Sequence, residues 1–130
     1  MTDISAALKA LGIGSYVIRG DKAQPENETE FNQMFFKVTG IDSGGGSIES
    51  NDPSDFGVTW SQVSAKMTEL QQAEPMRLLR EERDRRLAET DWWGLSDLTM
   101  TQAQTDYRQA LRDITNSYTS LDDVVWPTKP

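Results

Sequence analysis

Residues 76–90 read MRLLREERDRRLAET, and this stretch decides the architecture of the C-terminal half of the chain. It carries five arginines against four acids, and four of its residues fall near one helical face: Met76, Leu79, Arg83 and Leu87. Glu82 precedes Arg86 by four residues, which is the favourable orientation for an ion pair on a helix. Pro75 fits the first turn of a helix but not its interior. We therefore predict a helix that starts at Pro75 and ends near Ala88, with a kinked, continuous rod as the alternative.

Two further helices flank this one in the sequence. Thr59 and Gln62 form a capping box that predicts a helix over 59–73, and Thr101 and Gln104 form another that predicts a helix over 102–116. The residues expected to face one way on the last helix are Ala103, Tyr107, Ala110, Leu111 and Ile114. We expect residues 76–89 and 102–116 to pack as a helical hairpin. In that hairpin, Trp92 and Tyr107 pin the two helices together and Trp126 folds back over them.

The N-terminal half mixes helical and strand patterns. A helix is expected over 3–11, capped by Thr2 or Asp3 and ended by Gly12. SYVIR at 15–19 is typical of a strand. Asn27 and Glu30 resemble a capping box that begins a helix over 28–37, with a strand as the rival interpretation.

These patterns predict an α+β fold, in which a small mixed N-terminal unit precedes a helical hairpin with an extended C-terminal tail. We expect the N-terminal module to cover residues 1–57 and the helical module to cover 58–130. Val124–Pro130 forms the tail, because Pro127 and Pro130 forbid a helix there. Val-Val-Trp is too apolar to be left in water, so we expect the tail to dock on the hairpin or to pair with a partner's surface.

Composition narrows the classes of function. Thirteen basic against 21 acidic residues give a net charge of −8, which argues against nucleic acids and anionic membranes as partners. The chain has no Cys and no His, so it lacks the commonest metal ligand and the commonest general base. We therefore expect no cofactor, no metal and no catalytic residue.

Three local motifs could suggest other functions, and each has a simpler explanation. Arg19-Gly20-Asp21 matches an integrin-binding tripeptide, but a strand that ends in a glycine turn accounts for it. The acids Asp42, Glu49, Asp52 and Asp55 surround a glycine-rich loop without EF-hand spacing. Glu81, Glu82 and Glu89 could serve a glycan hydrolase, but they lie among arginines that keep them ionised.

Three segments of the C-terminal half carry a more specific signal in their order. They are LLREERDRRLAETDWW at 78–93, YRQALRD at 107–113 and VVWP at 124–127. Together they resemble the phage tail assembly chaperone family found among phages of marine bacteria. One departure from the family pattern is Trp93, where many members carry a small or polar residue. The N-terminal half looks like a module often fused upstream of that unit in such phages.

The resemblance implies a non-enzymatic protein that binds a phage tail or tail-fibre component in the host cytoplasm during assembly. Retention in the virion as a structural part, and self-association, are further possibilities that it leaves open. We expect the partner-binding residues to be Trp92, Trp93, Tyr107, Arg108, Trp126 and Pro127, because Trp, Tyr and Arg are enriched at interface hot spots. The alternatives are a cytosolic adaptor that binds a host protein and a tail-associated glycan hydrolase.

Overall fold

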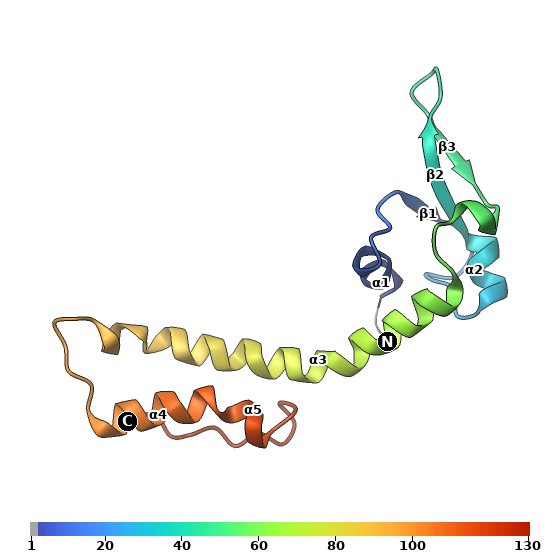
Figure 1. Ribbon diagram of the computed structural model, residues 1–130. Coiled ribbons are helices and arrows are strands. Elements are labelled where there is room, and N and C mark those ends of the chain that lie inside the picture. The colour runs from blue at the N-terminus through green and yellow to red at the C-terminus, as the bar shows by residue number, and fades with distance from the viewer. Residues whose placement is uncertain (1–2) are drawn as a thin grey trace. The chain divides into compact units, whose positions relative to one another are not determined.

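Helices and a small three-stranded antiparallel sheet make the chain an α+β protein, as the sequence predicted (Figure 1). The computed structural model describes residues 3–130. By its internal contacts the chain forms an N-terminal unit that ends at Gln72 and a C-terminal unit, Ala73–Pro130. That residues 1–57 and 58–130 are separate modules, as expected from the sequence, stays a prediction.

Helix α1, Ile4–Ala10, confirms the first predicted helix. The Asp3 carboxylate caps it by accepting a hydrogen bond from the Ser5 N–H at 2.9 Å. Thr2, the other candidate cap, lies outside the described residues. Gly12 follows the helix with a φ of 81°, a backbone conformation that side chains other than that of glycine rarely adopt.

The sheet has the strand order β1-β2-β3. Strand β1, Tyr16–Ile18, confirms the strand predicted over 15–19 and pairs with β2, Phe35–Ile41. Strand β3, Ser47–Ser50, pairs with the other edge of β2. The Asp42 carboxylate closes the β2–β3 turn by accepting hydrogen bonds from two backbone N–H groups of the glycine-rich loop.

The helix predicted over 28–37 is too long at its C-terminal end. Helix α2 is Glu28–Met34, and β2 begins at Phe35, so the rival strand interpretation holds for residues 35–37. The Asn51 side chain explains the switch, because its amide donates to the carbonyl oxygens of Asn32 and Phe35 at 2.9 and 2.7 Å. Those carbonyls lie where the helix ends and lack helical partners.

The start of α2 also differs in detail from the predicted capping box. The Asn27 side chain accepts from the Glu30 N–H at 2.9 Å, as a cap should. The Glu30 carboxylate, however, accepts from the N–H of Glu26 and not from that of Asn27. Only half of the reciprocal pair is therefore present.

An aromatic cluster forms the core of the N-terminal unit. The rings of Phe31, Phe35 and Phe56 lie with centroids 4.7 to 5.7 Å apart, and Trp60 packs beside Phe31. The buried members of this core are Ile4, Ala7, Leu8, Phe31, Phe35, Phe56, Val58, Val63 and Met67. The core thus recruits the first turns of the long helix that follows.

Helix α3, Trp60–Glu89, runs through Pro75 without a break, so the prediction of a new helix at Pro75 is wrong and the continuous alternative holds. An interior proline costs a helix about 3 kcal/mol. Good helix formers on both sides offset that cost. The Arg77 guanidinium also reaches back across the proline to the Glu74 carboxylate at 2.6 Å. The capping box of Thr59 and Gln62 is present at the start, as predicted.

The last predicted helix, 102–116, is divided in two. Helix α4 is Gln102–Arg112 and begins with the predicted capping box of Thr101 and Gln104. Helix α5, Ile114–Ser117, is a separate short turn after Asp113. The residues of α5 are β-branched or short and polar, and such residues propagate a helix poorly.

Only part of the predicted apolar face is buried. Tyr107, Leu111 and Ile114 are buried, but Ala103 and Ala110 are exposed. The buried face of α4 is therefore narrower than the sequence pattern suggested. A short 3₁₀ helix η2, Asp91–Gly94, lies between α3 and α4 and carries the tryptophan pair.

Candidate partner-binding site

Arg108 of α4 holds the C-terminal end of α3. Its Nη1 donates to the Leu87 carbonyl at 3.0 Å and to the Thr90 Oγ1 at 2.7 Å, and its Nη2 donates to the Asp91 carboxylate at 3.0 Å. A cation at this place also interacts favourably with the negative end of the helix dipole. Arg108 is only 14% exposed, and Thr90 is fully buried. The contact therefore fixes where the chain leaves α3.

Trp93, not Trp92, pins the hairpin. Trp93 and Tyr107 are each 5% exposed, and their ring centroids lie 6.0 Å apart beside the buried Leu111. The core role predicted for Tyr107 is confirmed, whereas that predicted for Trp92 is wrong. Trp92 is 57% exposed and meets Trp93 only edge to face, at 6.2 Å between centroids. A 3₁₀ turn has three residues, so adjacent side chains point in different directions and only one of the two can enter the core.

The C-terminal tail docks on the same unit through Trp126. The Arg86 guanidinium lies over the Trp126 ring at 4.3 Å, and the ring packs against the cluster around Trp93 and Tyr107. Pro127 is half-buried, whereas Val125 is exposed. Within the described chain, residues 124–130 form no helix or strand, so the predicted extended tail is what the structure shows.

The six expected site residues thus divide into two groups. Trp93, Tyr107 and Arg108 lie inside the hairpin end and build it. Trp92 lies on its surface, and Trp126 and Pro127 lie half-buried along it. Three residues that sequence reasoning did not single out also belong here: Thr90, Leu95 and Leu98. Thr90 gave no signal in the sequence, since a threonine after a helix is ordinarily exposed.

The carboxylates of the arginine-rich part of α3 are ion-paired. Glu82 accepts from Arg85 at 2.7 Å and from Arg86 at 3.0 Å, which confirms the predicted Glu82–Arg86 pair. The hydrogen bond from Arg85, more than any other contact, lowers the pKa of Glu82 to about 2. A glycan hydrolase needs a carboxyl group with a raised pKa as its general acid, and Glu82 is shifted the opposite way.

The acids of the N-terminal loops have local structural partners. Glu49 pairs with Arg19, and this hydrogen bond lowers the pKa of Glu49. Asp52 caps the 3₁₀ helix η1, Pro53–Asp55, by accepting from the Ser54 N–H. Among residues 3–130, His, Cys, Asp and Glu form no group of three or more that could hold a metal ion.

Arg19-Gly20-Asp21 lines a cavity of about 360 Å³ in the N-terminal unit. Lys22 and Glu30 contribute to the same wall, and the Lys22 ammonium bonds the Glu30 carboxylate at 2.7 Å. This contact, ahead of smaller ones, lowers the pKa of Glu30. Two charged groups of the cavity wall thus pair with each other, and Arg19 pairs with Glu49 outside it.

The three ordered sequence segments meet in one place. Arg108 joins the second segment to Asp91 of the first, and Arg86 of the first joins Trp126 of the third. Residues 76–130 match the family model of the phage tail assembly chaperone protein. The resemblance seen in the sequence is thereby confirmed for residues 76–130, where the three segments also lie in contact. Comparisons with curated proteins and with solved structures gave no match.

The family match covers nearly the whole C-terminal unit and supports a role in phage tail assembly. A tail assembly chaperone acts in the host during assembly, and its partner is in general a phage tail protein. The match suggests a non-enzymatic role without excluding an activity. In the described part of the chain no helix is long and apolar enough to span a membrane.

Proposed function

We propose that the chain binds a tail or tail-fibre protein in the host cytoplasm during assembly, through the end of the C-terminal unit that carries Trp92. The observation that supports this most is the exposure of Trp92 on a firmly held support. Arg108 fixes the backbone on one side of it, and Trp93 fixes the backbone on the other. A large aromatic ring on a preorganised backbone loses little conformational entropy on binding.

The expected site residues would then act in different ways. Trp92 makes the direct contact, while Trp93, Tyr107 and Arg108 position it. Trp126 and Pro127 offer a second contact where the tail lies half-exposed on the hairpin. Substitution of a positioning residue should weaken binding only to the extent that it disturbs the fold.

The experiment is affinity purification of the full-length, tagged chain from phage-infected cells, with mass spectrometry of the bound proteins. Trp92→Ala should lose the phage tail protein, and Leu121→Ala should keep it. Leu121 is the matched control, because it is another exposed apolar residue of the same unit. Both variants must melt within a few degrees of the unchanged chain.

The same experiment separates the alternatives. Recovery of a host protein and no tail protein would contradict the proposal and favour the host-adaptor alternative. Equal recovery of the tail protein by both variants would show that Trp92 does not make the contact. Mass spectrometry of purified virions then distinguishes a transient chaperone from a retained structural part.

A further inference from the structure

The connector between α3 and α4 exposes three large apolar side chains within seven residues. Trp92, Leu95 and Leu98 are 57%, 54% and 46% exposed. Two successive turns hold them together, since the Leu95 N–H donates to the Trp92 carbonyl at 3.2 Å and the Leu98 N–H to the Leu95 carbonyl at 3.0 Å. Turns of this kind bring their end residues within about 7 Å of each other. We call these three residues the tip patch.

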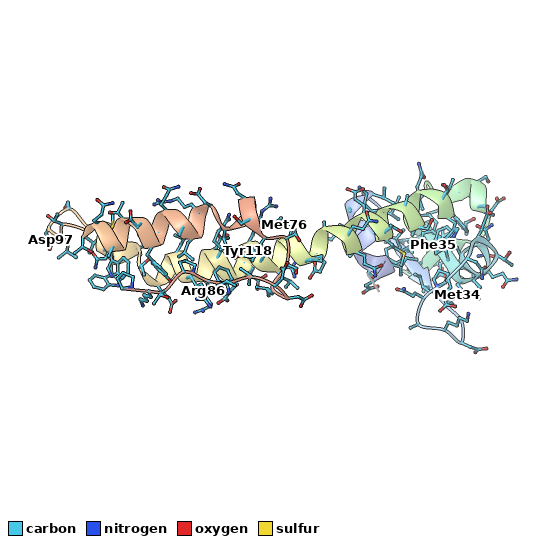
Figure 2. All side chains as sticks on the ribbon, turned by 90° about the horizontal axis from the view of Figure 1, so that it is seen from below. Met34, Phe35, Met76, Arg86, Asp97 and Tyr118 are labelled. Carbon is cyan, nitrogen blue, oxygen red and sulfur yellow. The ribbon has the colours of Figure 1, made fainter. Side chains whose placement is uncertain are left out.

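The chain segment that carries the tip patch contains acidic residues and no basic ones. Between Leu87 and Tyr107 the chain has four acids and no Lys or Arg. The acids are Glu89, Asp91, Asp97 and Asp106. Figure 2 shows Asp97 in the connector, at the end of the hairpin.

Glu89 and Asp91 pair with Arg85 and Arg108, so only Asp97 and Asp106 differ from the acids of the helix in their partners. Along α3 the carboxylates of Glu74, Glu81 and Glu82 are paired with arginines. Within the described chain, Asp97 and Asp106 have no ion-pair partner, and Asp106 only accepts from the Gln102 side chain. Beside the tip patch, the carboxylates of Asp97 and Asp106 therefore carry negative charge that no ion pair of the described residues offsets.

From this juxtaposition we propose that the tip patch binds a segment of the tail protein that combines aliphatic or aromatic side chains with Lys or Arg. The apolar groups of the partner would cover Trp92, Leu95 and Leu98, and its cations would face Asp97 and Asp106. Complementary charge of this kind gives specificity and speeds association. This inference rests on the proposed function and adds the chemistry of the partner to it.

The acidic segment also discriminates between classes of partner. A nucleic acid or an anionic lipid surface would bring further negative charge to Asp97 and Asp106 and be repelled. An acidic or neutral apolar segment would cover the three apolar residues but leave the two carboxylates without partners. Only a basic apolar segment satisfies both features at once.

The test is selection of a displayed library of random peptides on the full-length chain, with counter-selection on Trp92→Ala. Enriched peptides should combine apolar residues with a net positive charge. One enriched peptide is then titrated against the chain and its variants. Trp92→Ala should weaken binding at least about tenfold, as loss of a hot-spot residue does. Leu121→Ala, the matched control, should leave binding unchanged.

Charge is tested with Asp97→Asn combined with Asp106→Asn, which keeps the size of both side chains. This variant should weaken binding several-fold at low salt, and most of the difference should vanish near 1 M salt, where screening is nearly complete. Enrichment of acidic or neutral peptides would overturn the proposal, as would a selection that yields no Trp92-dependent peptide. Neither result affects recovery of the tail protein from infected cells, so the two proposals can fail separately.

Discussion

Replacement of Trp93 by alanine should destabilise the C-terminal unit far more than replacement of its neighbour Trp92. Trp93 is 5% exposed and packs on Tyr107 and Leu111, and truncation of such a buried ring costs about 3–5 kcal/mol. Trp92 is mostly exposed and loses only an edge-to-face contact, which is worth about 1 kcal/mol. The two changes are chemically identical and adjacent, so each is the control for the other.

The size of the unit makes this difference easy to measure. A unit of roughly 60 residues has about 3–9 kcal/mol of stability in total. Loss of Trp93 therefore removes much or all of it, and the helical signal of residues 73–130 should melt well below that of the unchanged chain. Urea titration followed by circular dichroism measures both variants. Equal losses, or a larger loss for Trp92→Ala, would refute the assignment of Trp93 to the core.

Three further perturbations test the contacts around the site. Arg108→Ala should lower the free energy of unfolding by about 2–3 kcal/mol in urea titration, because it removes charge-assisted hydrogen bonds, one of them to the buried Thr90. Arg112→Ala, on the same helix, should lower it by under about 0.5 kcal/mol. Similar losses for the two variants would contradict the account. Trp126→Ala should lower the free energy of unfolding in urea by about 1–2 kcal/mol, because it removes packing and a cation–π contact. An unchanged urea midpoint would show that the tail is not docked. The folded-state pKa of Glu82, about 2, lies below its ordinary value of 4.5. The stabilisation from its ion pairs is therefore complete above pH 4.5 and is lost as the pH falls toward 2. The stability difference between the unchanged chain and Glu82→Gln should shrink over that window, and a constant difference would contradict the pairing.

Local signals in the sequence predicted the fold class and most element starts. The capping boxes at Thr59 and Thr101 act within one helical turn, so a sequence pattern reports them directly. Asp3 and Gly12 bounded the first helix for the same reason. The order of the three motifs in the C-terminal half was sufficient to indicate the family whose model matches residues 76–130.

The errors have three different causes. Helix α2 ends early because Asn51, far along the chain, supplies donors to its last carbonyls. Helix α3 continues through Pro75 because the good helix formers on both sides outweigh the cost of an interior proline. No periodic pattern tells which of two adjacent tryptophans in a 3₁₀ turn faces inward, so the roles of Trp92 and Trp93 required the packing itself.

The sequence therefore predicted where the site lies but not the role of each of its residues. The sequence pointed to aromatic residues and to Arg108 near the end of the hairpin. It gave no indication that Thr90 is buried beneath the Arg108 guanidinium. Leu95 and Leu98 were also missed, because isolated leucines in a polar connector are common on protein surfaces.

Hydrogen–deuterium exchange of the full-length chain, with and without the tail protein recovered from infected cells, tests the central claim most directly. If the tip patch is the contact, slower exchange on binding should be concentrated in peptides that cover residues 89–101. Peptides from the β2–β3 hairpin should exchange at the same rate in both states, which provides an internal control. Protection confined to the β2–β3 hairpin, or to residues 121–130 alone, would contradict the account.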